Sequence, residues 1–302
     1  MALSRAQILR ELEPGLNAIF GMSYSGYENE HTVLFDAESS SRAWEEDVLF
    51  TGFGGAAVKT EGSAVTYADN AEAWASRYQH ETVALAFAIT EEAMEDNLYD
   101  SLAKRNTKAL ARAMAHTKQV KAANVYNNAF SSSFLGGDGV ALISTAHPLA
   151  SGGTLSNRPT TYADLSEASL ETACIDIAGF VDDKDIPIAV MGESLHIPRQ
   201  LVFIAERILR SPYRPGVADN DINALNTMGK LPKGYSVNHR FTDPDAWFIR
   251  TDVSDGMKNF SRVGLSTKME GDFETGNVRY KARERYSFGW SDPRGVYASE
   301  GI

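Results

Sequence analysis

The sequence predicts an α+β fold, and three observations lead to this class. The stretch from Thr90 to about Asn128 has neither Pro nor Gly and consists mainly of residues that favour helices. Residues 82–89 and 278–290 alternate in side-chain character with the period of two that strands have. Between these stretches, apolar residues recur at helical spacing over 170–181 and 201–209. One long helix, isolated strands and a mixed α/β region thus share the chain.

The composition excludes several classes of protein. The chain has 302 residues, 43% of them apolar, which is enough to bury a core, and a net charge of −11 disfavours binding of nucleic acid by the protein as a whole. The single cysteine, Cys174, excludes an internal disulfide and a cysteine-based metal cluster. Charges run through the first 21 residues, and no window approaches 18 apolar residues. We therefore expect a soluble protein made in the cytoplasm.

Residues 1–45 are expected to form an N-terminal arm. A short amphipathic helix is predicted from Ser4 to about Phe20, and Pro14-Gly15 is expected to interrupt it. Residues 21–47 are polar with scattered aromatic side chains, so this segment is expected to lie on another subunit rather than to build a local core. The aromatic residues are Tyr24, Tyr27, Phe35 and Trp44, and the apolar residues of the helix are Ile8, Leu9, Leu12, Leu16, Ile19 and Phe20.

Residues 46–89 predict an extended hairpin. Short strand-like runs at 48–50 and 64–67 are separated by glycines, and Val83, Leu85, Phe87 and Ile89 then alternate with smaller residues. We expect the chain to rise near Phe50, turn around 69–73 and return into the long helix. Because the segment is too polar for a core sheet, neighbouring elements must stabilise it.

The long helix is predicted to start with Thr90 as its N-cap. At 1.5 Å per residue it would be roughly 55 Å long. Its apolar stripe is narrow and rich in alanine, so another element must lie along it; a coiled coil, a domain-spanning helix and a strut in an assembly all satisfy this requirement. The stripe consists of Met94, Leu98, Leu102, Ala109, Ala113, Val120 and Ala123.

The middle of the chain begins with a glycine-rich loop, residues 131–161, that holds one strand candidate at 140–143. Asp164 and Glu167 then predict a capping box for a helix whose apolar side includes Cys174, so this thiol is expected to face a core.

A buried strand is predicted at 188–191, followed by a helix that starts at Pro198 and ends before Pro212. A further strand is predicted over 245–252. The apolar residues of the helix are Leu201, Ile204, Ala205, Ile208 and Leu209.

The strand predicted near the C-terminus has one apolar and one basic face. The apolar face is interrupted by Glu284 alone. A row of four bases either binds nucleic acid or pairs with carboxylates, for instance those in the first turns of the long helix, and the acidic net charge favours the carboxylates. The apolar face has Val278, Tyr280, Ala282, Tyr286, Phe288 and Trp290, and the basic face has Arg279, Lys281, Arg283 and Arg285.

The sequence predicts no catalytic, cofactor-binding or metal-binding residue. Gly52, Gly54 and Ala57 have the spacing of a dinucleotide-binding motif, but the residues after them cannot continue as the helix that this motif needs. Cys174 on a core face is expected to be a small buried hydrophobe. The six histidines have no ligand spacing, and His116 near the stripe of the long helix is expected to be packed or at an interface. They are His31, His80, His116, His147, His196 and His239.

The order of these elements resembles a tailed-bacteriophage major capsid protein of the Hong Kong 97 fold, and local motifs carry the same resemblance. GESLHIP at 192–198 and the helix after it resemble the strand-to-helix segment of that family's axial domain. NHRFTDPDAWFI at 238–249 resembles the approach to its late strand, and KARERY at 281–286 with PRGVY at 293–297 resembles the end of its peripheral domain. HPL followed by GGT, over 147–154, resembles head subunits of the Mu type.

The resemblance implies a division of the chain into five segments. They are the N-terminal arm (1–45), the extended hairpin or E-loop (46–89), a peripheral domain with the long spine helix (90–165), a central α/β axial domain (166–257) and a peripheral return strand (258–302).

The resemblance also implies a structural protein and not an enzyme. Its copies would form hexamers and pentamers of an icosahedral head around double-stranded DNA, with the hairpin and arm on neighbouring subunits. The implied location is the virion, with assembly in the host cytoplasm and no membrane contact. The implied partners are copies of the chain, a separate scaffolding protein, a portal and decoration proteins. Lys59 is the hairpin lysine available for the cross-link to a neighbouring Asn that some relatives form, but no residue around it predicts activation.

Two alternatives remain open at this point. An encapsulin-like shell would share the fold but enclose a protein cargo. An α/β hydrolytic enzyme would use the long helix as a dimerisation arm and would form small oligomers with a concave site, whereas a shell protein would form particles of megadalton mass.

Overall fold

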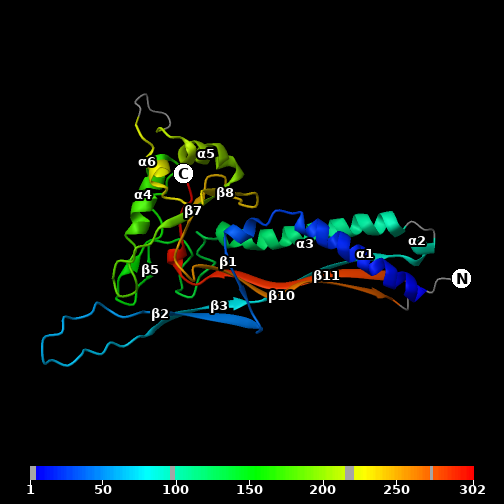
Figure 1. Cartoon of the computed structure of the whole chain (residues 1–302), viewed down its shortest axis with the longest axis horizontal. Coiled ribbons are helices and arrows are strands. Elements are labelled where there is room, and N and C mark those ends of the chain that lie inside the picture. Colours follow the sequence, from blue (N-terminus) through cyan, green and yellow to red (C-terminus); the bar gives the residue numbers. More distant parts are fainter. Residues whose placement is uncertain (1–4, 96–98, 215–220, 273–274) are drawn as a thin grey trace.

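A computed structural model describes residues 5–95, 99–214, 221–272 and 275–302, with the side chains of 5–12 and 94–100 outside this description. The described residues form an elongated part and a compact central part, each built on a four-stranded sheet, and a projecting two-stranded hairpin (Figure 1). The hairpin and the N-terminal helix point toward opposite ends of the molecule (Figure 1). The predicted α+β class is confirmed.

The sheet of the elongated part has the strand order β1-β10-β11-β4. Its strands are β1 (Asp36–Ser39), β10 (Met257–Gly271), β11 (Val278–Trp290) and β4 (Glu81–Ile89). β1 runs parallel to β10, and the other neighbours are antiparallel. The two period-two stretches are thus confirmed as β4 and β11, and they lie side by side although nearly two hundred residues separate them in the sequence.

Helices α1 (Arg5–Ser25), α2 (Glu91–Glu95) and α3 (Tyr99–Asn127) belong to the same part. The Oγ1 atom of Thr90 accepts a hydrogen bond from the amide of Ala93 at 3.4 Å, which confirms the predicted N-cap. Residues 96–98 lie outside the described residues, so the predicted continuity of one helix from Thr90 stays a prediction. α3 alone is about 43 Å long at 1.5 Å per residue.

The apolar stripe predicted for α3 is wrong over its first half, whereas in its second half Ala123 is buried and Ala113 and Val120 are partly buried, as predicted. Leu102 and Ala109 are exposed, whereas Ala103 and Leu110, one position later, are buried against the sheet and α1. One position is a rotation of about 100° around the helix. The polar residues Thr107 and Gln119 occupy the buried face, which obscured it in the sequence. Met94 and Leu98 of the predicted stripe lie outside the described side chains, and His116 is exposed on the single subunit.

The expected interruption of the first helix is also wrong, because α1 continues through Pro14. Its C-terminal half packs on α3 and the sheet through Leu16 and Phe20, and Oδ1 of Asn17 accepts hydrogen bonds from Thr267 at 2.8 Å and Tyr280 at 2.7 Å. The start at Ser4 and the side chains of Ile8, Leu9 and Leu12 lie outside the described residues.

The expectation that residues 21–47 have no local core fails at Phe35. Its ring is buried next to Tyr126 of α3 and Phe288 of β11, at centroid distances of 5.7 and 5.1 Å. The short helix η1 (Glu30–Val33) leads into β1, so this segment is built into its own subunit.

The sheet of the central part has the order β12-β9-β7-β8. Its strands are β7 (Gly192–Pro198), β8 (Tyr235–Asn238), β9 (Trp247–Thr251) and β12 (Val296–Ser299). β9 confirms the strand predicted over 245–252. β12 pairs with β9, and Tyr297 lies in the central core, so the segment 258–302 ends with a strand of the central sheet.

Helix α4 (Glu167–Ala178) packs on the central sheet, and its cap differs from the predicted one. Ser166 and Ser169 form the capping box, two residues after the predicted Asp164, because either serine hydroxyl reaches the other residue's amide. Cys174 is half-buried against the central core, and burial raises the pKa of its thiol, in agreement with the expected packing role.

Two boundaries in the central part are also corrected. The strand predicted at 188–191 is irregular, and β7 starts at Gly192 instead. Pro198 ends β7, and the short helix η2 (Arg199–Leu201) precedes α5 (Val202–Arg210). Helix α6 (Ala224–Met228) completes the elements that cover this sheet.

The hairpin consists of β2 (Trp44–Phe50) paired antiparallel with β3 (Glu72–Gln79). The hairpin is confirmed, but residues 64–67 form no strand, and the turn lies at 60–63 rather than around 69–73, where Ser63 donates its amide to the carbonyl of Thr60 at 3.1 Å. β4 is not part of the hairpin because it joins the sheet of the elongated part.

The loop after α3 contains β5 (His147–Pro148) and β6 (Thr154–Leu155), a pair of two-residue strands. The strand predicted at 140–143 is reduced to a single bridge between Leu135 and Ala141. The short helix η3 (Pro293–Gly295) connects β11 to β12.

The register of α3 is tested by two matched substitutions. Leu110→Ala removes a buried side chain and should lower the free energy of unfolding by about 2–5 kcal/mol. Leu102→Ala, on the exposed side of the same helix, should cost well under about 1 kcal/mol. Equilibrium urea unfolding measures both, and a larger loss for Leu102→Ala would contradict the assigned face.

Candidate assembly surfaces

The hairpin presents a long exposed tip between β2 and β3. The amide of Thr51 donates to the carbonyl of Ala71 at 2.9 Å, and the amide of Ala71 donates to the hydroxyl of Thr51 at 3.2 Å. These bonds close the base of the tip. Between them the chain makes few hydrogen bonds to itself, and Lys59 is exposed there.

Large apolar side chains are concentrated on this tip. Val58 and Tyr67 are 94% and 95% exposed, and Phe53 and Val65 are also more than half exposed. An isolated two-stranded hairpin is at best marginally stable in water, and an exposed apolar patch commonly marks a contact surface. The tip is therefore a candidate surface for contact with another molecule.

The base of the hairpin is fixed by a socket around Tyr78 of β3. The buried Tyr78 ring contacts Phe260 of β10 at a centroid distance of 4.8 Å, edge to face, and its hydroxyl bonds to the hydroxyl of Ser291. The ring lies over Gly289, where a Cβ atom would come within 2.7 Å of it. A glycine is needed at this position because any side chain would displace the ring.

Lys258 of β10 fixes the other strand of the hairpin. Its ammonium nitrogen lies 2.7 Å from Asp47 of β2, 2.7 Å from Asp255 and 3.3 Å from Glu38 of β1. Burial by itself would lower the pKa of Lys258, but hydrogen bonds to Asp255 and Asp47 outweigh it and raise the pKa above its usual value. The lysine therefore stays charged and holds β2 against the sheet. Asp47 also accepts a hydrogen bond from Ser291 at 2.8 Å, which joins this cluster to the Tyr78 socket.

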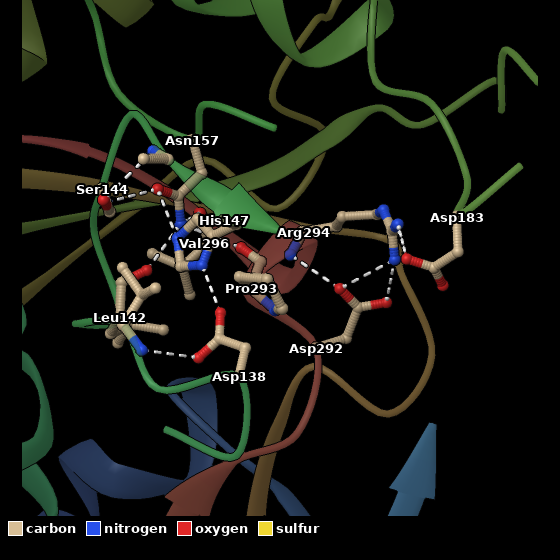
Figure 2. A network of polar contacts seen from close by, with 12 residues as sticks. Asp138, Leu142, Ser144, His147, Asn157, Asp183, Asp292, Pro293, Arg294 and Val296 are labelled. Carbon is tan, nitrogen blue, oxygen red and sulfur yellow. Dashed lines mark hydrogen bonds and ion pairs between the residues drawn. The ribbon is translucent and has the colours of Figure 1, made fainter. Parts of the chain in front are cut away.

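A second buried polar cluster connects the elongated and central parts, and Figure 2 shows its residues. Arg294 of η3 donates from Nη2 to Asp183 at 3.0 Å and from Nε to the carbonyl of Val181 at 2.8 Å, both in the loop after α4. Its Nη1 atom lies 3.1 Å from Asp292, which follows β11. One buried guanidinium thus joins the end of the long strand to the central part.

Asn157 organises the other half of the cluster (Figure 2). Its Nδ2 atom donates to the carbonyls of Leu142, Pro293 and Val296 at 2.7, 3.0 and 3.1 Å. Its Oδ1 atom accepts from the amide of Ser144, and Nε2 of His147 lies 3.3 Å from it. The loop after α3 is thereby attached to η3 and β12. The sequence contained no signal for this cluster, because its members are single polar residues in separate loops.

The central part carries its own exposed apolar residues. Ile175 on α4, Phe203 on α5 and Met228 on α6 are each more than 60% exposed. They lie on three helices of one compact part, away from its core. These residues are candidates for contacts between central parts of neighbouring subunits.

The histidines form no metal site in the described part of the chain, where no three His, Cys, Asp or Glu side chains could hold an ion. His147 contacts Asp138 at 2.6 Å, His239 contacts Glu30 at 2.8 Å, and His31 lies 2.9 Å from the side chain of Gln119. His80 lies between the hydroxyls of Ser40 and Ser287. The contacts tie neighbouring segments together.

A Ser–His pair does occur, but its environment does not suit catalysis. His196 lies between the hydroxyls of Ser194, at 3.0 Å, and Ser236, at 2.6 Å, and is fully buried. Burial, with smaller effects from Arg250 and Lys233, lowers its pKa to about 3, so the imidazole is a weak base. The buried Ser–His pair therefore does not support the alternative that the protein is a hydrolytic enzyme. Gly52 and Gly54, the glycines of the dinucleotide-like spacing, lie in the exposed tip of the hairpin, with no helix after them.

No described helix combines the length and apolar character needed to cross a bilayer.

Comparisons with known proteins relate the chain to shell-forming subunits. The model of a family described as phage capsid protein matches residues 72–299. Among solved structures, the chain is similar to the capsid of an empty GTA particle, with 14% identity over 90% of each chain and a TM-score of 0.54. A structure from Microbacterium phage Oxtober96 also has 14% identity over 90% of each chain, with a TM-score of 0.50.

The virus-like particle from Pyrococcus furiosus has 8% identity over 94% of this chain and 97% of that one, with a TM-score of 0.50. No curated protein matches the sequence. At such identities the structural likeness establishes the fold, which is that of the Hong Kong 97 type.

The lysine at the hairpin base is tested by Lys258→Met, which keeps most of the side-chain volume but removes the charge. The substitution leaves Asp47 without its cation, and the free energy of unfolding should fall by about 2 kcal/mol. The expected loss is smaller than for a fully buried ion pair, because Asp255 is exposed to water. Lys268→Met, in an exposed pair with Glu270, should leave the free energy of unfolding nearly unchanged, because water screens this pair. Equal losses in urea unfolding would argue against the anchor.

Buried histidines predict acid sensitivity. In the unfolded chain, His196 binds a proton near pH 6.5, whereas in the folded chain it does so only near pH 3, so the unfolded state binds more protons in between. Stability should therefore fall as the pH drops through this window, by up to about 1.4 kcal/mol per pH unit for this residue. His196→Gln should flatten the measured pH dependence of unfolding. An unaltered slope in His196→Gln would contradict the assignment.

Proposed function

The chain belongs to the phage capsid protein family, whose model covers residues 72–299, and on that premise we propose that its copies form hexamers and pentamers that close an icosahedral head around double-stranded DNA. It is a structural protein of the capsid. The observation that supports the proposed assembly most strongly is the hairpin, which projects from the body (Figure 1). Its tip carries exposed apolar side chains.

In the proposed shell, the hairpin tip lies on a neighbouring subunit and buries Phe53, Val58, Val65 and Tyr67. Each large apolar side chain contributes roughly 1.5–3 kcal/mol when it is fully removed from water. Partial burial in one contact therefore gives a modest gain, and the loss of mobility of the tip offsets part of it. Repetition of this contact around a closed shell gives high overall stability, while each single contact stays weak enough to be corrected.

The central parts are proposed to meet around the axes of the hexamers and pentamers. Support comes from the exposed apolar residues Ile175, Phe203 and Met228 on three helices of this part. The net charge of −11 suits a container, because walls that bound DNA tightly would hinder its packaging and release.

We further propose that the shell is built in the host cytoplasm with a separate scaffolding protein, and that it contacts a portal and decoration proteins but no membrane. A shell held by weak repeated contacts can close with more than one curvature, so a scaffolding protein that sets the curvature is favoured. The division into arm, hairpin, peripheral and axial segments stays part of this proposal, with β4 in the sheet of the elongated part and β12 in that of the central part. We also propose that the protein has no enzymatic activity and that it is related to head subunits of the Mu type.

An encapsulin-like cargo shell is the second candidate, supported by the fold shared with the Pyrococcus furiosus particle. The contents separate the two functions. Particles purified from the native source should contain DNA under the phage head proposal, and a defined protein cargo without DNA would favour the second candidate.

The proposed role of the hairpin tip is tested by replacing residues 53–69 with a short Gly-Asn turn. β2 and β3 remain paired in this variant, so the free energy of unfolding should change by less than about 0.5 kcal/mol. Electron microscopy should find megadalton particles for the unmodified chain, with its scaffolding partner where needed, and none for the variant.

Lys59→Ala serves as the control, because it changes the charge of the tip but leaves the apolar side chains. It should still form particles. Normal particles from the shortened variant would contradict the role of the tip, and small discrete oligomers of the unmodified chain under every condition would contradict the shell itself.

A further inference from the structure

Strand β4 forms an unprotected edge of the sheet in the elongated part. It pairs with β11 on one side, and no described strand pairs with its other side. Free strand edges are usually protected by charged residues or proline, because their unpaired amides and carbonyls attract other strands. The eight residues from Thr82 to Ile89 contain neither a charge nor a proline. Such an edge is suited to the addition of a further strand.

The surface beside this edge combines small side chains on β4 with basic side chains on β11. The outward face of β4 consists of the exposed small residues Thr82, Ala84, Ala86 and Ala88. Directly opposite them on β11 lie Arg285, Arg283, Lys281 and Arg279. Paired residues share one face of a sheet, so a row of alanines separates the free edge from a row of cations.

Part of this cationic row forms no direct ion pair within the described chain. Arg279 pairs with Asp272, and Lys268 on β10 pairs with Glu270, whose charge also attracts Lys281. Lys281 and Arg283 themselves have no ion pair among the described residues. The predicted partners in the first turns of the long helix are not the ones observed for Arg279. A shallow hollow lies here, lined by Ala86, Lys268, Arg279 and Lys281 together with the two acids.

The opposite face of β4 differs in character. Val83 and Phe87 pack against the core under α3, whereas Leu85 between them is about half exposed. A strand added at this edge would therefore meet alanines and cations on one face and an apolar side chain on the other.

We propose that β4 and the row of cations from Arg279 to Arg285 form a docking site for an extended acidic segment of a partner protein, which adds to the sheet as a fifth strand. Neighbouring strands lie about 4.8 Å apart, so the added strand lies about 10 Å from β11. Glutamate side chains on it extend across the alanine row to Lys281 and Arg283. Its alternate residues are apolar and cover Leu85.

Charge decides between this occupant and a second copy of β4. Antiparallel pairing of two β4 edges would place two rows of arginine and lysine on one continuous sheet face, with no acid between them. An acidic segment instead neutralises the row, and backbone hydrogen bonds give affinity while alternate side chains give selectivity. The proposal concerns a different face from the hairpin tip and does not depend on the proposed shell.

The test uses the full chain and a fluorescent ten-residue peptide that alternates Glu with Val. Anisotropy should show saturable binding that weakens with salt, and a peptide that alternates Lys with Val should bind at least tenfold more weakly. The double substitution Lys281→Glu with Arg283→Glu should lower the affinity at least tenfold. Arg199→Glu, an exposed charge reversal in the central part, should leave it unchanged. Equal binding by both peptides, no binding, or preferred binding of single-stranded DNA would overturn the proposal.

Strand addition is tested separately by hydrogen exchange. Binding of the acidic peptide should slow exchange over residues 82–88. Adjacent residues of a strand direct their amides to opposite sides. One of the two variants Leu85→Pro and Ala86→Pro therefore removes an amide from the free edge, and the other removes an amide that bonds to β11. The variant with an unchanged circular dichroism spectrum should bind at least tenfold more weakly.

Unchanged binding in that variant, or no protection over 82–88, would overturn strand addition. So would protection that rises with protein concentration in the absence of peptide, because it would mean that a second copy covers the edge.

Discussion

The ion pair between Lys258 and Asp47 is the interaction on which the shape of the subunit depends most. The hairpin buries little surface of its own, so nothing within β2 and β3 determines the direction in which it points. Direction comes from the base, where Lys258 holds β2 and the Tyr78 ring fills the space above Gly289. Because both contacts are made to β10 and β11, the hairpin is aligned with the long sheet.

Buried polar contacts also fix the junction between the elongated and the central part. Arg294 and Asn157 connect β11, the loop after α4 and the loop after α3 through buried hydrogen bonds. Buried polar groups of this kind are costly unless every member is paired, so they favour one relative arrangement of the parts. A rigid junction and an anchored hairpin together give a subunit in which the position of the tip is defined relative to the central part.

The sequence predicted those elements that depend on local pattern. The lengths of β4 and β11, the N-cap at Thr90 and the packing of Cys174 follow from periodicity and capping chemistry alone. The buried face of α3 was predicted only in part, because Thr107 and Gln119 are buried among alanines. The hydrogen bonding of Gln119 to His31 is visible only in three dimensions. The parallel pairing of β1 with β10 and the return of β12 to the central sheet join residues far apart in the chain. The hairpin was predictable as a candidate surface, whereas its anchor was not, since Lys258, Asp47 and Tyr78 belong to no motif.

Cross-linking of isotopically mixed particles can show whether the anchored hairpin reaches a different subunit. Equal amounts of 14N- and 15N-labelled chains would be assembled together and treated with a lysine-reactive cross-linker. Lys59 at the exposed tip should then appear in mixed 14N–15N cross-links about as often as in pairs of one isotope, as random mixing of subunits requires. Cross-links of Lys59 that always join chains of the same isotope would place the tip on its own subunit and rule out the proposed contact with a neighbour.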